Sequence, residues 1–283
     1  PTAAQRGAWD AIAGGDHALV VAPTGSGKTL AAFLWALDVL LSSPPPADPL
    51  QRCRVLYVSP LKALAVDVER NLRSPLVGIR QAAQRLGRSL PHVEVGMRTG
   101  DTPPEQRRAF GKRPPDILIT TPESLYLVLT SGARAGLAGV RTVILDEIHA
   151  VAGSKRGTHL ALSLERLDAL LERPDGPGPA QRVGLSATVR PVDAVAAFLG
   201  GARAPDDGGR RVVVVQPPAD KRIEVDVVVP VPDLTEPGLP GEPPQLDDGD
   251  AAPGRPSVWP HVEERVVDLV AAHRSTLVFT NAR

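Results

Sequence analysis

Residues 22–29, Ala-Pro-Thr-Gly-Ser-Gly-Lys-Thr, have the types and spacing of a phosphate-binding loop. Its two glycines let the backbone turn tightly and bring N–H groups to a phosphate without a side chain in the way. Lys28 would reach the β- and γ-phosphates of a nucleotide, and the Thr29 hydroxyl would hold Mg²⁺. The sequence therefore predicts ATP binding with Mg²⁺ at Thr24, Gly25, Ser26, Gly27, Lys28 and Thr29. The alternative is a Gly-rich turn, which the apolar runs on both sides of the loop disfavour.

Two adjacent carboxylates, Asp146 and Glu147, follow the apolar run 140–145. Burying uncompensated carboxylates at a strand tip is expensive, so such a pair needs a chemical reason. Asp146 would hold Mg²⁺, and Glu147 would orient and deprotonate the water that attacks the γ-phosphate. Lys28, Asp146 and Glu147 are the predicted catalytic residues.

Polar residues near these motifs have weaker signals. Gln5 precedes the phosphate loop and could read an adenine edge, because an amide donates and accepts hydrogen bonds at once; a surface glutamine is the equal alternative. His149 would link the nucleotide site to Ser186-Ala187-Thr188, and a purely structural histidine is its alternative. Ser186 and Thr188 would exchange hydrogen bonds that couple Asp146 or His149 to nucleic acid.

The elements that must position these residues read as strands alternating with helices, which predicts an α/β fold with a mostly parallel sheet. Ser59 is expected to cap a helix with Pro60 in its first turn, and that amphipathic helix over 64–79 should be interrupted near Ser74-Pro75. Thr121 and Pro122 repeat the arrangement. The predicted strands cover residues 18–22, 54–58, 93–97, 116–120, 140–145 and 182–185, with helices over 30–41, 158–171 and 192–199.

Parallel strand ends lie along one edge of a sheet, where ligands bind in open α/β folds. Lys62, in the first turn after a strand, could hold a nucleic-acid phosphate there, although a simple capped helix is the alternative. Residues 51–115 support the first interpretation, with 13 Lys or Arg against 5 Asp or Glu, but solvated helix faces explain such a balance equally well.

The last quarter of the sequence differs in composition. Two β-rich runs, 211–215 and 223–229, precede a segment rich in Pro, Gly and acidic residues over 230–256, which predicts a linker. A helix over 259–272 and the start of a strand over 276–281 follow. The expected domains are 1–215, a connecting region 216–258, and the beginning of a second domain at 259–283.

Composition narrows the classes further. Cys53 is the only cysteine, which excludes an internal disulfide and a zinc site of several thiolates and fits a reducing cytoplasm. No apolar run approaches the roughly 18 residues of a membrane span, so no membrane association is expected.

The order of the motifs resembles a superfamily 2 helicase: Gln5, the phosphate loop, Ser-Pro-Leu-Lys-Ala-Leu-Ala, Thr-Gly-Asp, Thr-Thr-Pro-Glu-Ser-Leu, Asp-Glu-Ile-His, Ser-Ala-Thr and Leu-Val-Phe-Thr-Asn. Residues 57–72 and 154–167 are similar to the Lhr (large helicase-related) group of DNA helicases. The resemblance implies a RecA-like first domain, and an incomplete second one whose later motifs and arginine finger are absent from this sequence.

By resemblance, such a protein hydrolyses ATP to move 3′ to 5′ along single-stranded DNA, displaces DNA or RNA from a duplex, and acts in DNA repair. Its further RecA-like and C-terminal domains would belong to the same polypeptide. An RNA helicase, or a remodelling ATPase without strand separation, is the alternative within the superfamily; a small-molecule kinase and a binding module without catalysis are the alternatives outside it. The resemblance assigns nucleic-acid contacts to Pro60, Lys62, Gly100, Asp101, Thr121, Pro122 and Ser124.

Overall fold

The computed structural model describes residues 1–174, 176–187, 189–203, 206, 208–218, 224–231 and 258–280. The chain divides into two compact units, Pro1–Ala219 and Asp220–Arg283. Unit 1 carries a seven-stranded sheet, and every pair of neighbouring strands in it is parallel. The strands, in the order β3-β4-β2-β5-β6-β1-β7, are β1 (His17–Val21), β2 (Val55–Val58), β3 (Val95–Arg98), β4 (Ile117–Thr120), β5 (Thr142–Leu145), β6 (Gln181–Ser186) and β7 (Val212–Val215).

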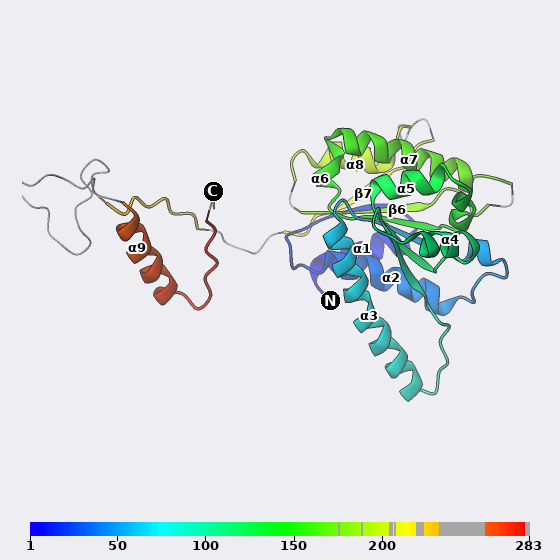
Figure 1. Ribbon diagram of the computed structural model, residues 1–283, viewed down its shortest axis with the longest axis horizontal. Coiled ribbons are helices and arrows are strands. Elements are labelled where there is room, and N and C mark those ends of the chain that lie inside the picture. The colour runs from blue at the N-terminus through cyan, green and yellow to red at the C-terminus, as the bar shows by residue number, and fades with distance from the viewer. Residues whose placement is uncertain are drawn as a thin grey trace, which may run out of the picture. The chain divides into compact units, whose positions relative to one another are not determined.

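Helices cover both faces of the sheet (Figure 1). One face packs against α1 (Ala3–Ala13), α2 (Lys28–Ser42) and α3 (Lys62–Arg85). The other packs mainly against α5 (Pro122–Leu129), α6 (His149–Ala152), α7 (Lys155–Leu171) and α8 (Val192–Gly200). The remaining elements of unit 1 are α4 (Pro104–Lys112) and the short 3-10 helices η1 (Pro49–Gln51) and η2 (Gly132–Leu137).

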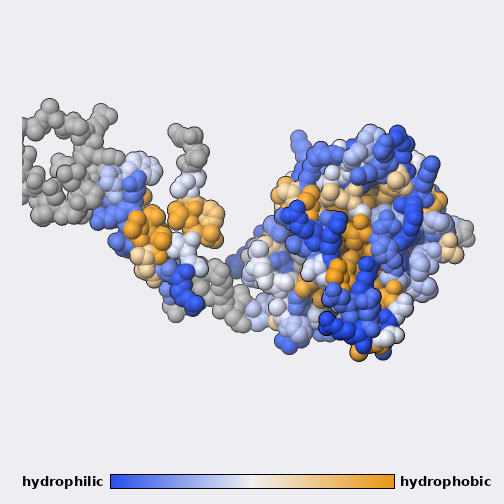
Figure 2. All heavy atoms as spheres, turned by 60° about the horizontal axis from the view of Figure 1, so that its bottom comes forward, coloured by the Kyte–Doolittle hydropathy of each residue, from blue (hydrophilic) through white to orange (hydrophobic). Residues whose placement is uncertain are grey.

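The alternation of side chains along each strand explains why both faces are covered. In β1, Ala18 and Val20 belong to the core under α1–α3, whereas Leu19 and Val21 belong to the core under α5–α8. A strand buried on both faces must be apolar throughout, which is the pattern of a parallel sheet between two layers of helices. The predicted α/β architecture is confirmed, and Figure 2 shows an apolar band between polar surfaces on the side of unit 1 that carries α1–α3.

The predicted start of α3 is wrong. Leu61, not Ser59, is the residue before the helix, and it has no side-chain cap. The buried Ser59 hydroxyl donates to the Leu61 carbonyl oxygen at 3.1 Å, so it does not accept from a helix N–H. Pro60 therefore lies outside the helix. The Thr121 prediction holds, because its side chain accepts from the Ser124 N–H at the start of α5.

The predicted interruption of α3 near Ser74-Pro75 is also wrong, since one helix runs through Pro75 to Arg85. A proline inside a helix removes a hydrogen bond and crowds the preceding turn. Val68 and Leu72 before Pro75 and Leu76 after it are buried in the core, so tertiary packing keeps the helix continuous through the proline.

Unit 2 contains α9 (Trp259–Ala272), as expected. Residues 224–229 and 276–280, however, are not in strands, although both were predicted to be. A β-rich segment forms a strand only when another strand supplies its hydrogen bonds, and composition does not reveal that partner. Within the described ranges, none of the helices has the length and apolarity that crossing a membrane requires.

Candidate nucleotide site and adjoining strand ends

The strand order gathers the candidate residues at the carboxyl edge of the sheet in two neighbouring groups. The phosphate loop follows β1, Asp146 and Glu147 follow β5, and Ser186 is the last residue of β6. These three strands are adjacent in the sheet. The candidate nucleic-acid residues follow β2, β3 and β4, which are also adjacent. The two groups meet where β2 pairs with β5.

The phosphate loop turns at two glycines with left-handed backbones, Gly25 at φ 83° and Gly27 at φ 84°. Lys28 begins α2 and is buried, and its Nζ donates to the carbonyl oxygens of Ala22 at 2.6 Å and Pro23 at 2.9 Å. Burial lowers the pKa of Lys28, while Glu147 and Asp146 act in the opposite direction. The loop therefore holds a cationic side chain at a helix N-terminus, which suits an anion.

The helix α1 holds this loop from one side. Gln5 accepts from the Thr2 N–H at 2.9 Å, and its Nε2 lies 3.4 Å from the Gly27 carbonyl oxygen. The Thr2 hydroxyl donates to the Ser26 carbonyl oxygen at 2.9 Å. The left-handed backbone of Gly27 strains any other residue, and a Cβ there would also lie 2.4 Å from Gln5 Nε2 unless that flexible side chain moved. The structure thus brings Gln5 to the nucleotide loop, and its reading of adenine stays a prediction.

Asp146 lies directly after β5 and is buried. The Tyr57 hydroxyl from β2 donates to its Oδ2, and the Glu147 N–H donates to its Oδ1 at 3.0 Å. Burial raises the pKa of Asp146 even though these donors and Lys28 lower it. The same burial, reinforced by Asp146, raises the pKa of Tyr57, so this hydroxyl stays a donor.

Glu147 has a left-handed backbone at φ 44°, which is unusual for a residue other than glycine. One of its carboxylate oxygens lies 3.5 Å from His149 Nδ1, and the same nitrogen lies 3.2 Å from the Ser186 hydroxyl oxygen. His149 therefore lies between Glu147 and the end of β6, and its predicted coupling of the nucleotide site to nucleic acid stays a prediction. Thr188 lies outside the described residues.

Lys28, Thr29, Asp146 and Glu147 line a single cavity of about 640 Å³, together with Thr24, Gly25 and Gly27. The Thr29 hydroxyl and the Asp146 carboxylate are oxygen donors of the kind that Mg²⁺ prefers, and Mg²⁺ commonly takes one or two carboxylates plus substrate phosphates. These residues fit the predicted Mg²⁺. Apolar groups of α2 and α3, including Phe33 and Leu72, line another part of the cavity.

The neighbouring group combines exposed side chains, Lys62 and Asp101, with buried ones, Thr121 and Ser124. Lys62 Nζ lies 2.8 Å from both carboxylate oxygens of Asp101, and a Cβ on Gly100 would lie 3.5 Å from the same nitrogen. Thr121 Oγ1 donates to the Ser124 hydroxyl at 3.2 Å, and Pro122 follows in the first turn of α5. Pro60, Lys62, Gly100, Asp101, Thr121, Pro122 and Ser124 thus follow three adjacent strands, and their role toward nucleic acid stays a prediction.

Two arginines that hold these loops were not predicted. Arg107 donates to the Gly100 carbonyl oxygen at 2.6 Å and to that of Thr102 at 2.8 Å. Arg156 donates to the Pro60 carbonyl oxygen at 2.9 Å and to Glu123 at 2.7 Å. Arg156 lies within the stretch that carries the Lhr resemblance, so its position was a usable signal. Arg107 is one of many arginines in a basic segment, and nothing local singles it out.

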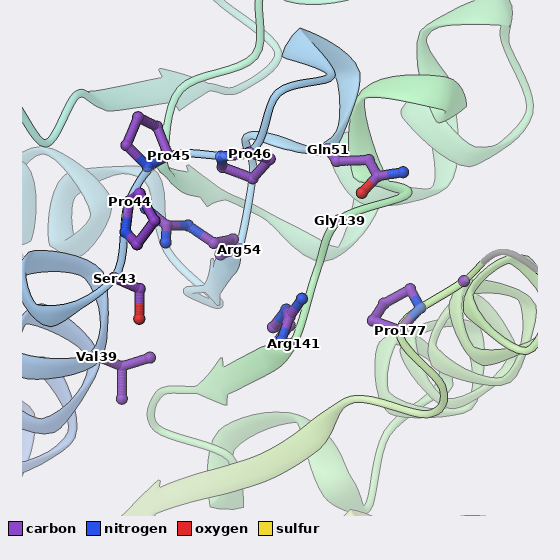
Figure 3. Close-up of a pocket in the computed structure, with 11 residues that line it drawn as sticks. Val39, Ser43, Pro44, Pro45, Pro46, Gln51, Arg54, Gly139, Arg141 and Pro177 are labelled. Carbon is purple, nitrogen blue, oxygen red and sulfur yellow. The ribbon is translucent and has the colours of Figure 1, made fainter.

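The opposite edge of the sheet has a cavity of about 390 Å³ (Figure 3). Arg54 and Arg141, which precede β2 and β5, line it with Pro44, Pro45 and Pro46. None of the predicted site residues lies there. The chemistry predicted from the sequence is therefore confined to the carboxyl edge.

Asp146→Asn should stabilise the protein in the absence of Mg²⁺ and nucleotide. A carboxyl whose pKa is raised by folding is harder to ionise in the native state, so its ionisation destabilises the fold as the pH rises above the unfolded value near 4. We expect the Tm at pH 7 to rise by a few degrees, since about 1 kcal/mol corresponds to about 2–4 °C in a chain of this size. Thermal unfolding at pH 7 and pH 3.5 measures it; an equal gain at both pH values would contradict this explanation.

A family model described as DEAD/DEAH box helicase matches residues 2–195. The chain is 58% identical over 283 residues to the "Lhr helicase/ probable uracil glycosylase" of Mycolicibacterium smegmatis and 52% identical over 287 residues to the "Lhr helicase/uracil glycosylase" of Escherichia coli. Both matches cover 100% of this chain but only 17% and 18% of those proteins, so the chain spans less than a fifth of their length.

A solved structure of Mycobacterium smegmatis helicase Lhr bound to ssDNA and AMP-PNP matches with a TM-score of 0.76 and 56% sequence identity. That match covers 100% of this chain and 32% of the solved chain.

Proposed function

The chain belongs to the DEAD/DEAH box helicase family, and we propose that the intact protein hydrolyses ATP with Mg²⁺ to move 3′ to 5′ along single-stranded DNA. We propose that this movement displaces a paired DNA or RNA strand. The observation that carries the proposal is the shared cavity of Lys28, Thr29, Asp146 and Glu147 beside the strand ends that carry Lys62, Gly100 and Thr121. The solved relative is bound to ssDNA and AMP-PNP, which supports single-stranded DNA and a nucleotide as the ligands of this protein.

Four residues of the cavity have a role in this proposal. Lys28 turns from the loop carbonyls to the β- and γ-phosphates, while Thr29 and Asp146 hold Mg²⁺. The ion supplies positive charge that neutralises the phosphates. Glu147 accepts the proton of the attacking water, and His149 fixes that carboxylate from one side. Because hydrolysis transfers the γ-phosphoryl to water, the products are ADP and inorganic phosphate.

The neighbouring loops hold the strand in this proposal. Gly100, Thr121 and Ser124 offer N–H and hydroxyl groups at strand and helix ends, which contact phosphate and sugar and carry little sequence information. His149 Nδ1 lies 3.2 Å from the Ser186 hydroxyl oxygen. Through this contact the loss of the γ-phosphate is transmitted to the end of β6, and we assign Thr188 to the same coupling. We assign ATP hydrolysis to 1–215, a connecting role to 216–258, and the second RecA-like domain from 259 onward.

The two bacterial relatives carry "uracil glycosylase" in their names, which supports a role in DNA repair. Buried Cys53 and helicase membership support a cytoplasmic location. The test is strand displacement by the intact protein on duplexes with a 3′ or a 5′ single-stranded tail of DNA or of RNA, each with DNA or RNA as the displaced strand. Displacement from 3′-tailed DNA is expected. Displacement that requires a 5′ tail, or an RNA tail, would overturn the proposed polarity or strand.

Lys62→Ala and Asp101→Asn should have opposite effects on the affinity for single-stranded DNA. Asp101 binds the Lys62 ammonium with both oxygens, so it competes with a phosphate for the same cation. We expect Lys62→Ala to weaken binding and to reduce the salt slope by about 0.7, the value for one phosphate contact on a single strand. Asp101→Asn should tighten binding severalfold at low salt. Fluorescence anisotropy titrations over a range of salt concentrations measure both; a parallel loss in the two variants would contradict the competition.

A further inference from the structure

A row of basic side chains lies on the helical layer beside the strand-binding loops. His159, Arg166 and Arg173 are spaced by seven residues along α7 and the turn after it. Seven residues are nearly two helical turns, so His159 and Arg166 lie on one face of α7, about 10 Å apart. Arg173, beyond the end of α7, lines the same hollow as Arg166. Arg134 of η2 adds a fourth, and we call Arg134, His159, Arg166 and Arg173 the α7 basic row. Figure 1 shows α5 lying beside α7 on this side of the sheet.

Three members of the row surround a hollow of about 220 Å³. Arg134, Arg166 and Arg173 line it with Leu129, Ala169 and Leu170, so no carboxylate is among the lining residues. The nearest acids in the sequence of α5 and α7 are engaged elsewhere: Glu123 binds Arg156, Glu165 binds Arg182 at 3.0 Å, and Asp168 binds Arg182 and Arg210. Glu172 lines a different cavity. Three like charges gathered without a counter-charge in the hollow favour an anion as the ligand.

Tyr126 of α5 shows which part of a nucleic acid would bind. Its ring lies 4.7 Å from the His159 ring, and Arg166 lies over it at 6.0 Å. The ring is 39% exposed and packs against two members of the row, so a base that stacked on it would share it with His159 and Arg166. Surfaces for single strands rely on aromatic platforms on which bases stack. Three arginines around one hollow fit backbone phosphates, and the phosphates of a duplex are accessible although its bases are hidden.

The row adjoins the candidate strand path. Helix α5 begins beside Thr121 and Ser124 and ends at Leu129, which lines the hollow. Eight helical residues span about 12 Å, so a duplex flanking the bound strand is within reach. We propose that the α7 basic row binds the phosphates of the duplex part of a tailed nucleic acid whose single strand lies at the carboxyl edge. This inference rests on the proposed function and adds a second contact surface to it.

A protein surface is the competing occupant, because Leu127 and Leu162 are 53% and 63% exposed on the same two helices. The row favours the nucleic acid, since apolar docking would not need uncompensated arginines. Arg166→Gln/Arg173→Gln and Leu127→Ser/Leu162→Ser separate the two, as each removes one kind of contact. Arg85→Gln/Arg88→Gln is the matched control, because both arginines are exposed at the end of α3.

The experiment measures the salt dependence of binding by the intact protein to a tailed duplex and to the tail alone. Arg166→Gln/Arg173→Gln should reduce the slope of log K against log salt by about 1.8 on the tailed duplex, or about 0.9 for each phosphate contact, and leave the tail unchanged. Arg166→Lys/Arg173→Lys should restore most of the slope, and both the Leu127/Leu162 and the Arg85/Arg88 variants should match the wild type.

An unchanged slope in the Arg166/Arg173 variant would overturn the proposal. An equal reduction of the slope on the tail alone would also overturn it. A lower Tm with an unchanged slope would overturn it as well, because it would mean that another part of the protein packs on this face. Stimulation of ATP hydrolysis by single-stranded DNA is measured in parallel. If the wild type lacks it, the proposed function fails, whereas the binding slopes still decide whether the row contacts a duplex.

Discussion

Glu147→Gln should reduce kcat for DNA-stimulated ATP hydrolysis by about 10²–10⁴-fold, the contribution of a general base. Glutamine keeps the size of the side chain but cannot accept a proton at pH 7. The site should still bind ATP, because Lys28, Thr29 and Asp146 remain in the cavity. Steady-state phosphate release, with nucleotide binding measured separately, tests this.

The matched control for this variant is Glu172→Gln, which removes one exposed carboxylate away from the nucleotide cavity. It should hydrolyse ATP at the wild-type rate. The backbone of Glu147, at φ 44°, is unchanged in kind by glutamine, so folding is not expected to change. A Glu147→Gln protein that retains most of its kcat would remove this residue from the role of base.

Lys28→Ala should abolish both ATP hydrolysis and the stabilisation of the protein by nucleotide. A ligand at 100 times its Kd stabilises a fold by about 2.7 kcal/mol, and this gain disappears when the phosphates lose their cation. Removing a preorganised donor of this kind lowers kcat by about 10²–10³-fold. The measurement is the difference in Tm with and without MgATP for each variant. Because Lys28→Ala also loses the two hydrogen bonds to Ala22 and Pro23, its Tm without nucleotide is the reference for its Tm with nucleotide.

Exposed Lys112→Ala is the control, and its Tm should rise with MgATP as in the wild type. If Lys28→Ala keeps a nucleotide-dependent rise in Tm of the same size, the phosphate loop would not be the nucleotide site.

The parts of the fold that the sequence predicts best are those in which local signals and burial agree. The strand before Asp146 is apolar, short and buried on both faces, and Thr121 with Pro122 caps α5 as expected. The phosphate loop and Glu147 are separated by more than 100 residues, yet they line one cavity. The motif order predicted their proximity, because parallel strands end at one edge, and the predicted RecA-like fold and Lhr resemblance are confirmed by the relatives.

The remainder depended on contacts between distant parts of the chain. Pro75 is read locally as a break, but the apolar face of α3 overrides it. Ser59 has the composition of a cap, but its hydroxyl is oriented to the Leu61 carbonyl. Tyr57, the donor to Asp146, looks like an ordinary core aromatic in the sequence, since only the pairing of β2 with β5 brings it to that carboxylate.

That same Tyr57 hydroxyl has a mechanical consequence. It belongs to β2, which leads into Pro60 and Lys62, while its acceptor, Asp146, directly follows β5 and precedes Glu147. A shift of the loop after β2 by a fraction of an ångström would alter how many donors the Asp146 oxygen has, and hence how strongly that oxygen attracts a divalent cation. In the proposed function, contact with the polynucleotide and affinity for the metal are thereby joined through the Tyr57 hydroxyl.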